Sequence, residues 1–178
     1  MFNDLKKVLL TQEQINKRVE ELGKQISDDY KGKDLLLVSV LKGSIVFMAD
    51  LMRAISINAN IDFLSVSSYG SGTKTTGVVK ILKDLDVSIE GKDVLVVEDI
   101  LDSGLTLSYI LGMLGDRNPK SLKICTFLDK PERRKAEIEV EYTGFTVPDE
   151  FVVGYGLDYD EKYRNLPVVG VLDEKIYL

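Results

Sequence analysis

A chain of 178 residues, 44% hydrophobic and 29% charged, is long enough for one globular domain that buries roughly 70% of its unfolded surface. The formal net charge of −6 argues against a broad nucleic-acid-binding surface, and no apolar run approaches the roughly 20 residues that span a bilayer. The absence of histidine and the presence of only one cysteine exclude a structural zinc site, a Ser-His-Asp triad and an internal disulfide. Any bound metal should therefore be a hard ion with oxygen ligands, such as Mg²⁺.

The N-terminal stretch MFNDLKKVLLTQEQ lacks a basic start, a long apolar segment and a small-residue cleavage site, so we expect no signal peptide. The single cysteine, Cys125, lies in the apolar run ICTFL, which favours a buried and unreactive thiol. Both features fit a cytoplasmic location.

The first third of the chain predicts two helices around one buried strand. Between Thr11 and Tyr30 apolar residues recur every three or four positions, which predicts an amphipathic helix with Thr11 as its N-cap. The short apolar run DLLLVSVL at 34–41 predicts a buried strand. The sequence LKGS then leads into a second predicted helix, IVFMADLMRAI, with Ser44 near its cap.

The middle of the chain continues with strands and one more helix. A strand over 60–68 opens into YGSGTKTTG, a polar loop rich in glycine and threonine, and a strand over 78–85 returns from it. The run 94–97 is the most strand-like in the chain, and 105–114 reads as the helix after it. A further strand is expected over 121–128.

Strands that alternate with helices indicate a parallel α/β sheet with right-handed crossovers, and we expect one domain over residues 1–178. Beyond Pro131 the pattern changes to shorter segments, EIEVEYTGF, FVVGYGLDY and VVGVL, which predict a small appendage. Ligands of such sheets bind beyond the carboxyl ends of the strands. Both LKGS and the acidic sequence that follows residues 94–97 are expected at such ends.

Three acidic residues gather in VLVVEDILDSGLTL at 94–107, namely Glu98, Asp99 and Asp102. Like charges at this spacing repel, so a positive or hydroxyl-rich partner should hold them there. The DSGLT turn that ends the string favours anion binding, because backbone N–H groups near a helix N-terminus form a nest and Gly104 permits a tight turn.

Hydroxyl donors from Ser103 and Thr106 add to this nest, and the acids before it can accept hydrogen bonds from a sugar diol or attract Mg²⁺. The combination indicates a phosphorylated ribose as ligand. The alternative is that Asp102 only caps the helix and the other two acids are solvated. Neither G-x-x-x-x-G-K-[ST] nor a G-x-G-x-x-G after a strand is present, so P-loop and dinucleotide-binding interpretations are poorly supported.

The same string resembles the 5-phosphoribosyl-1-pyrophosphate (PRPP) signature of type I phosphoribosyltransferases, in its hypoxanthine-guanine form. LKGS at 41–44 resembles the pyrophosphate loop of that family, SSYG at 67–70 its mobile loop, and FVVGYGLDYDEKYRNLP at 151–167 its purine and pyrophosphate site. These motifs stand in the order of the family and cover nearly the whole chain. The resemblance implies an α/β fold with a central parallel sheet flanked by helices. It also implies a small hood, formed by the N-terminal segment and residues 130–178.

The resemblance implies a purine salvage enzyme that transfers phosphoribosyl from PRPP to hypoxanthine or guanine, giving IMP or GMP and pyrophosphate. It implies Mg²⁺ as cofactor, with two ions in the closed complex, and a homodimer or homotetramer without nucleic-acid or membrane partners. The alternatives are a xanthine-preferring transferase, a non-catalytic PRPP-binding regulator and a structural protein with a vestigial site. A regulator usually carries an added nucleic-acid-binding element, which this sequence lacks.

The resemblance also implies roles for single residues. The PRPP ligands are expected to be Glu98, Asp99, Asp102, Ser103, Gly104, Leu105 and Thr106, of which Leu105 is a lysine in some relatives. Asp102 matches the general base toward the purine imidazole nitrogen. The pyrophosphate ligands are expected to be Leu41, Lys42, Gly43 and Arg164, with a cis peptide between the first two.

The purine is expected to contact Lys130, Phe151, Val152 and Asp158. Lys130 would donate to the six-position oxygen and Phe151 would stack on the base. The expected Mg²⁺ ligands are Glu98, Asp99 and Asp158, and the mobile loop is represented by Ser68 and Tyr69. Three alternatives stay open: a solvated Lys42, a core role for Phe151, and a surface ion pair of Arg164 with Asp160 or Glu161.

Overall fold

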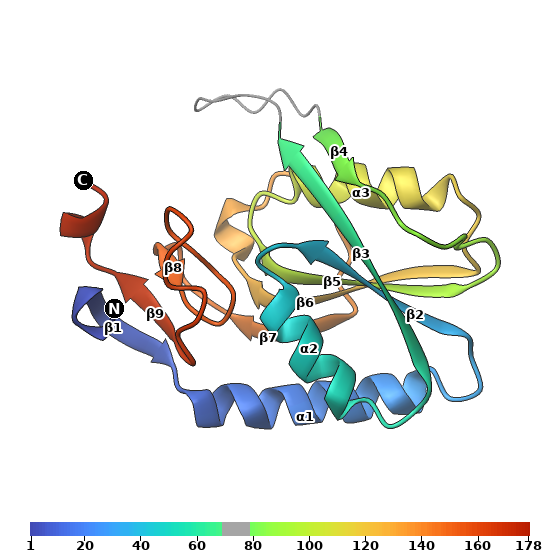
Figure 1. Cartoon of the computed structure of the whole chain (residues 1–178), viewed down its shortest axis with the longest axis horizontal. Helices are drawn as coiled ribbons and strands as arrows, with labels where there is room; N and C mark the ends of the chain where they lie inside the picture. Colours follow the sequence, from blue (N-terminus) through green and yellow to red (C-terminus); the bar gives the residue numbers. More distant parts are fainter. Residues whose placement is uncertain (69–78) are drawn as a thin grey trace.

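The computed structural model describes residues 1–68 and 79–178, which form two β-sheets and the helices around them (Figure 1). The large sheet has six strands in the order β4-β3-β2-β5-β6-β7, and the small sheet has three in the order β1-β9-β8. The strands are β1 Leu5–Leu10, β2 Leu35–Leu41, β3 Ala59–Ser68, β4 Val79–Lys83, β5 Asp93–Leu101, β6 Ser121–Asp129, β7 Tyr142–Thr146, β8 Val152–Val153 and β9 Val169–Leu172. The helices are α1 Gln12–Asp29, α2 Ile45–Ala54 and α3 Leu105–Gly115, with 3-10 turns η1 Phe2–Asp4, η2 Pro131–Arg133 and η3 Glu174–Ile176.

The large sheet is mostly parallel, as the alternation of strands and helices predicts. β2 pairs in parallel with β3 and with β5, and β5, β6 and β7 continue the parallel order. The strand that returns from the glycine-rich loop, β4, pairs antiparallel with β3 at the edge of the sheet. No helix within the described residues is long and apolar enough to cross a membrane.

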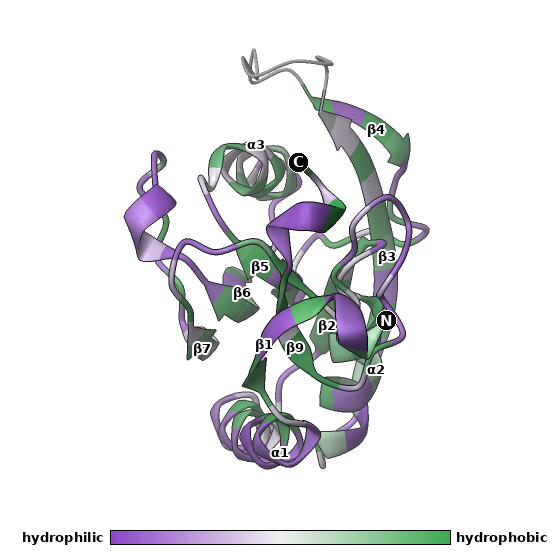
Figure 2. Ribbon diagram, turned by 90° about the vertical axis from the view of Figure 1, so that its left-hand side faces the viewer, coloured by the Kyte–Doolittle hydropathy of each residue, from purple (hydrophilic) through white to green (hydrophobic). Residues whose placement is uncertain are grey.

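Alternation along the central strands divides the apolar core into two layers, with α1 and α2 on one face of the large sheet and α3 on the other (Figure 2). The strand residues that pack with α1 and α2 include Leu35, Leu37, Leu95 and Val97. Those that pack with α3 include Leu36, Val38, Val94 and Val96. Because both faces are covered, these strands read as continuous apolar runs.

Helix α1 begins where the sequence predicts. Thr11 accepts from the backbone N–H of Gln14, and the Gln14 side chain accepts from the backbone N–H of Thr11, which completes a capping box. The buried face consists of the apolar residues at helical spacing, Ile15, Val19, Leu22 and Ile26. Full burial of such side chains contributes roughly 1.5–3 kcal/mol each, so packing outweighs the cap in fixing this helix.

The structure corrects two expectations. Strand β5 does not end at residue 97 but continues to Leu101, because its pairing with β6 continues there, with Glu98 beside Thr126 and Leu101 beside Asp129. The acid pair therefore lies within the strand. The N-terminal segment contains strand β1, which the sequence pattern did not predict and which pairs antiparallel with β9.

Both chain termini lie at the small sheet, which stands at the carboxyl end of the large sheet (Figure 1). Strand β9 joins β1 from the N-terminal segment to β8 from the C-terminal part of the chain. This arrangement places residues 151–164 beside the turn that follows β2 and, through that turn, near the end of β5.

Candidate functional site

The turn between β5 and α3 forms a small polar cavity. Gly104 precedes α3 with a φ of 78°, and a Cβ at this position would also lie 2.9 Å from Ile138 Cδ1. Ser103 Oγ accepts a hydrogen bond from the N–H of Leu105 at 3.4 Å. The cavity has a volume of about 160 Å³ and is lined by Glu98, Ile100, Leu101, Asp102, Ser103, Gly104, Thr106 and Leu107. A cavity of this kind at a helix N-terminus suits a phosphate group.

Asp102, at the start of this turn, faces cations that the sequence analysis did not single out. Arg133 Nε lies 2.8 Å from Asp102 Oδ1, and Arg134 Nε donates to the Asp102 carbonyl oxygen at 3.2 Å. Both arginines belong to the basic run PERRK, which directly follows Lys130. That run is the one sequence signal that could have identified them.

Glu98 and Asp99 are adjacent carboxylates in a densely packed part of β5. Burial raises the pKa of Glu98 well above its usual range, and the charge of Asp99 raises it further. Burial also raises the pKa of Asp99, against hydrogen bonding from the N–H of Ile100 and the positive charge of Arg164. The pair would gain from a cation or from hydroxyl donors.

The turn after β2 meets both β5 and the segment that carries Arg164. The peptide between Leu41 and Lys42 is cis, as the resemblance implies. A Cβ at Gly43 would lie 1.7 Å from Asp99 Oδ2, and a Cβ at Gly156 would lie 2.1 Å from the Gly43 carbonyl oxygen. Glycine at both positions therefore allows three distant segments to touch.

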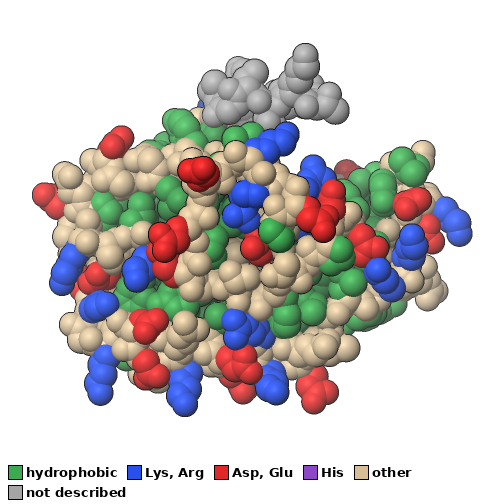
Figure 3. All heavy atoms as spheres, turned by 180° about the vertical axis from the view of Figure 1, so that it is seen from behind, with side chains coloured by type: hydrophobic (Ala, Val, Ile, Leu, Met, Phe, Trp, Pro, Cys, Tyr) green, Lys and Arg blue, Asp and Glu red, His purple; other side chains and the backbone are tan. Residues whose placement is uncertain are grey.

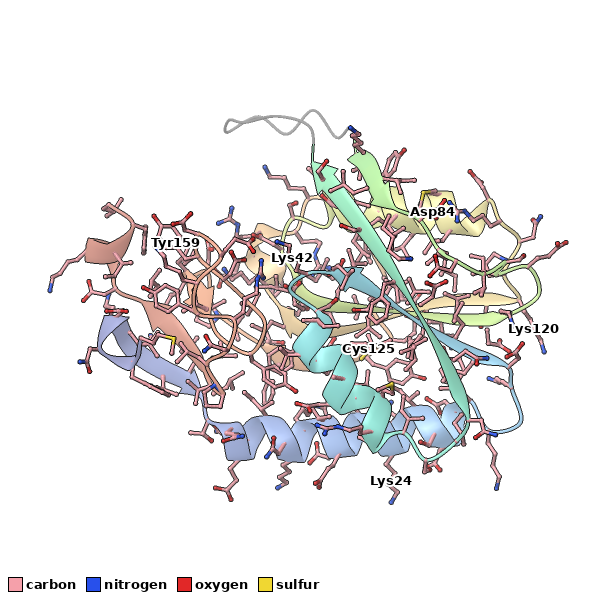
Figure 4. The ribbon with its side chains drawn as sticks, in the orientation of Figure 1. Lys24, Lys42, Asp84, Lys120, Cys125 and Tyr159 are labelled. Atoms are coloured by element: carbon pink, nitrogen blue, oxygen red, sulfur yellow. The ribbon has the colours of Figure 1, made fainter. Side chains whose placement is uncertain are left out.

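Two cations share one carboxylate next to this turn. Lys42 Nζ lies 2.8 Å from Glu161 Oε2, and Arg164 Nη2 lies 3.1 Å from Glu161 Oε1. The Lys42 hydrogen bond, followed by that of Arg164, lowers the pKa of Glu161. Of the surface pairs considered for Arg164, the one with Glu161 is therefore present, whereas Asp160 pairs with Lys162 instead. Lys42 lies at the carboxyl end of β2 (Figure 4), and through their shared partner Glu161 it forms a cationic pair with Arg164.

Asp158 does not join the other two acids that are expected to hold Mg²⁺. Its carboxylate lies 3.0 Å from Arg164 Nη1 and accepts the N–H of Glu161 at 2.9 Å. Within residues 1–68 and 79–178, no three acidic, cysteine or histidine side chains gather closely enough to hold a metal ion alone. The separate pair Glu98 and Asp99 is the arrangement that Mg²⁺ uses when substrate phosphates and water supply the other ligands.

Lys130 is buried at the carboxyl end of β6, where Leu101 accepts its backbone N–H. Its ammonium group donates to the Glu150 carbonyl oxygen at 2.7 Å and lies 3.9 Å from Asp149 Oδ1. Burial lowers the pKa of Lys130, while the charges of Asp102 and Asp149 oppose that shift. A buried donor beside the 151–164 segment can recognise an oxo group.

Phe151 is 41% exposed, which excludes the core role left open for it, while the next residue, Val152, is buried in β8. The ring of Phe151 contacts Tyr177 and Tyr159, two residues that the sequence analysis did not single out. An exposed aromatic surface at this position suits stacking on a planar ligand.

Of the two residues expected to represent a mobile loop, Ser68 ends β3, and Tyr69 lies outside the described residues. The structure therefore leaves that expectation untested. The other expected residues converge from the ends of β2, β5 and β6 and from the 151–164 segment.

Comparisons with known proteins give the same assignment for the whole chain. Residues 7–160 match the model of the phosphoribosyl transferase domain. The hypoxanthine-guanine phosphoribosyltransferase of Staphylococcus aureus is 56% identical over 177 residues, which cover 99% of each chain. The enzyme of the same name from Mycobacterium tuberculosis is 55% identical over 98% of this chain and 89% of its own.

Solved structures agree with these sequence matches. The crystal structure of a Staphylococcus aureus hypoxanthine phosphoribosyltransferase has a TM-score of 0.98 at 56% identity, covering 100% of this chain and 97% of that one. A hypoxanthine-guanine phosphoribosyltransferase from Bacillus anthracis, with HEPES in its active site, has a TM-score of 0.91 at 54% identity, covering 95% and 99%. At such identities the similarity extends beyond the fold to the family.

Proposed function

This chain belongs to the phosphoribosyltransferase family, in its hypoxanthine-guanine branch, and we propose that it transfers the phosphoribosyl group of PRPP to hypoxanthine or guanine. The products are IMP or GMP and pyrophosphate. The observation that carries this proposal is the contact of the Gly43 turn with Asp99 and with Gly156, which brings three motifs together at the carboxyl end of the sheet.

We assign the 5′-phosphate to the cavity at the turn between β5 and α3. Backbone N–H groups at the start of α3, with the hydroxyls of Ser103 and Thr106, would donate to the phosphoryl oxygens. Glu98, which lines the same cavity, and Asp99 beside it would accept hydrogen bonds from the ribose hydroxyls. The exposed position of Leu105 leaves phosphate contact at this residue to its backbone.

We assign pyrophosphate to the Gly43 turn and to the cations beside it. Lys42 and Arg164 now share the carboxylate of Glu161, so pyrophosphate oxygens would replace Glu161 as their partner. When the bond between ribose C1 and the pyrophosphate oxygen breaks, its electron pair leaves with pyrophosphate. The two cations would stabilise that negative charge.

We assign the purine to the space bounded by Lys130 and Phe151. The Lys130 ammonium would donate to the six-position oxygen, exchanging its bond to the Glu150 carbonyl, while Phe151 would stack on the ring and the Val152 backbone would bind its edge. Asp102 would accept the proton of one imidazole nitrogen as the opposite nitrogen attacks ribose C1. Lysine has donors only, so this pocket favours an oxo group over an amino group.

We propose that Mg²⁺ accompanies PRPP, with two ions in the closed complex. Glu98 and Asp99 would hold one ion together with substrate oxygens, and Asp158 would orient toward the other once pyrophosphate engages Arg164. When bound, Mg²⁺ supplies charge that stabilises the departing pyrophosphate. The raised pKa values of both β5 acids support this, because a cation would offset the cost of burying their charges.

We further propose a single domain over residues 1–178 in which the small sheet and the 130–178 segment form a hood over the base. We propose a homodimer or homotetramer, located in the cytoplasm. The exposed apolar side chains of Met52, Ile61 and Val87, which line a groove of about 600 Å³ together with Asn60 and Lys92, are available for a subunit contact. Light scattering after size-exclusion chromatography measures that state.

Two alternatives make different predictions. A xanthine-preferring enzyme would use the same PRPP site, and a non-catalytic regulator would bind PRPP without turnover. On the face seen in Figure 3, lysine and arginine side chains are interspersed with acidic ones, which gives no support to a nucleic-acid-binding regulator.

The decisive experiment is a steady-state assay of PRPP consumption with hypoxanthine, guanine, xanthine and adenine, each with and without Mg²⁺. We expect Mg²⁺-dependent turnover with the first two bases and little with adenine. A preference for xanthine would replace the proposed substrate, and PRPP binding without turnover would favour the regulator.

A further inference from the structure

The ring of Phe151 belongs to an aromatic cluster that includes the second-to-last residue of the chain. Tyr177 lies almost parallel to Phe151, with ring centroids 5.1 Å apart and an interplanar angle of 28°. Tyr159 lies perpendicular to Phe151, with ring centroids 5.7 Å apart and an interplanar angle of 86°, and its centroid lies 6.2 Å from that of Tyr177. Stacked and edge-on geometries of this kind are the favoured arrangements of aromatic side chains.

Backbone contacts fix the position of Tyr177 relative to Phe151. The N–H of Leu172, at the end of β9, donates to the Phe151 carbonyl oxygen at 2.9 Å. The next residue, Asp173, caps the 3-10 turn η3 and donates its own N–H to the Asp4 carbonyl oxygen at 2.8 Å. The short segment from β9 to Tyr177 is therefore hydrogen-bonded to the backbone of Phe151 at its first residue, Leu172. The hydrogen bond from Asp173 to Asp4 fixes the next residue.

Phe151 needs such support because it receives little from the core. The residue is 41% exposed, so the core restrains its ring less than it restrains the ring of a fully buried phenylalanine. Tyr177 stacks on one face of the ring and Tyr159 packs perpendicular to it, and the residue keeps 41% exposure, which offers a surface that a planar base can use.

We propose that Tyr177 is a positioning residue for the 6-oxopurine: it stacks on one face of Phe151 and holds that ring in the orientation that receives the base. This inference rests on the proposed function. Tyr177 itself does not touch the reacting atoms, so its effect should appear in base binding and not in PRPP binding.

Three substitutions of Tyr177 test the proposal. Tyr177→Ala removes the ring, Tyr177→Leu keeps apolar bulk without it, and Tyr177→Phe keeps the ring without its hydroxyl. We expect the KM for hypoxanthine to rise about 3- to 10-fold in the first two, the range that one aromatic pair supports, and to stay at the wild-type value in the third. The KM for PRPP should be unchanged in all three.

Tyr109→Ala is the control for loss of a tyrosine ring away from the cluster, because Tyr109 is an exposed tyrosine (44%) on α3, which covers the face of the large sheet opposite α1 and α2. We expect this variant to keep both KM values. Melting temperatures of all variants separate base binding from stability. If Tyr177→Ala does not fold, Tyr177→Leu carries the comparison with Tyr177→Phe.

Two results would overturn the proposal. Equal KM values for hypoxanthine in wild type, Tyr177→Leu and Tyr177→Phe would show that the ring of Tyr177 has no part in base binding. A lower KM without the ring would mean that Tyr177 covers the face that the base uses. Failure of the wild-type enzyme to consume any base with PRPP would instead contradict the proposed function, so the two failures are distinguishable.

Discussion

Gly43 and Asp99 occupy complementary space: a Cβ on Gly43 would lie 1.7 Å from Asp99 Oδ2 and 2.8 Å from Asp99 Cγ. The backbone of Gly43 is not in the left-handed region, so its conformation alone does not require glycine. Glycine is required at position 43 because a side chain there would prevent the turn after β2 from approaching the acidic pair of β5.

Gly43→Ala should displace the Asp99 carboxylate and reduce kcat/KM at least about 100-fold, since displacements of about 1 Å at a reacting centre have effects of that size. Steady-state kinetics with PRPP and hypoxanthine measure this loss. Circular dichroism should show an unchanged fold, because the substitution acts on a turn at the end of the sheet.

Gly112→Ala is the matched control for that substitution. Gly112 lies inside α3, and a Cβ there would meet nothing within 4 Å. Alanine at this position should leave turnover unchanged and stabilise the protein by about 1 kcal/mol. Wild-type kinetics in the Gly43 variant would show that the position of Asp99 does not matter for the reaction.

The central elements could be predicted from sequence because their signals are local. The N-cap and the apolar period of α1 predict that helix, and continuous apolar runs predict the central strands. Strand β1 could not be predicted in this way, because LKKVLL becomes a strand only where β9 supplies its partner. The extension of β5 through Glu98 likewise depends on pairing with β6.

In the candidate site, too, the residues with local sequence signals could be predicted, and the contacts between distant segments could not. The residues of DSGLT could be predicted because the turn, the helix start and the hydroxyls are consecutive in the chain. The contact of Gly156 with the Gly43 carbonyl joins segments far apart in the sequence. The stacking of Tyr177 on Phe151 has no signal in the local sequence around either residue. Such contacts follow from tertiary packing and require the structure.

Asp102→Asn should lower kcat about 100- to 10,000-fold, the usual contribution of a general base, while PRPP binding stays near the wild-type value. The amide keeps the size of the carboxylate and cannot take up the proton. Steady-state kinetics and calorimetric PRPP titration separate the two effects. An unchanged kcat would remove Asp102 from the mechanism.

Asp102→Asn also removes the ion pair of Asp102 with Arg133, and Asp149→Asn controls for that loss. Asp149 is a second partner of the same arginine, with Arg133 Nη1 3.3 Å from Asp149 Oδ1. This variant should keep kcat close to that of the wild type. A similar loss of kcat in both variants would assign the effect to Arg133 and not to the proton acceptor.

The KM for hypoxanthine should rise at alkaline pH before ordinary lysines titrate. Burial lowers the pKa of Lys130 below its usual 10.5, so its ammonium loses the proton at a lower pH than an exposed lysine. Loss of a charged donor weakens a hydrogen bond by about 1.4 kcal/mol, which corresponds to about 10-fold in KM. The KM for PRPP, measured in the same buffers, should not follow this rise.

Lys130→Arg tests the origin of that alkaline change, because a guanidinium stays protonated throughout the accessible range. Relative to its own value at neutral pH, the variant should show a smaller alkaline rise in KM for hypoxanthine. An identical rise in both proteins would trace the effect to ionisation of the base itself.

Cys125 should react with a thiol reagent only after unfolding. The thiol is buried between the large sheet and α1 and α2, and this burial raises its pKa (Figure 4). We expect no labelling of the native protein by a disulfide reagent and one thiol per chain in guanidinium chloride. Labelling of the native protein without loss of structure would contradict the buried placement.

A paired aspartate far from the site offers a test of stability alone. Arg117 Nη1 and Nη2 donate to Asp84 Oδ1 and Oδ2 at 2.8 and 2.9 Å, across from the site near β4 and α3 (Figure 4). The Arg117 hydrogen bonds lower the pKa of Asp84 below its usual 3.8. Because the carboxylate is 47% exposed, solvent screening limits the pair to about 0.5–1 kcal/mol.

Asp84→Asn should therefore reduce the free energy of unfolding by about 0.5–1 kcal/mol at neutral pH without a change in turnover. A carboxylate with a lowered pKa in the folded state contributes fully above its unfolded pKa, and this contribution is lost as pH falls through the folded value. The difference between variant and wild type should thus be constant from pH 7 to 5, begin to fall near the unfolded pKa of 3.8, and disappear only below the lower pKa of the folded state. Urea denaturation across this pH range measures the difference in the free energy of unfolding. Arg117→Gln should give the same loss, and the double variant should lose no more than either single variant. A difference that persists at low pH would mean that the charge of Asp84 is not its cause.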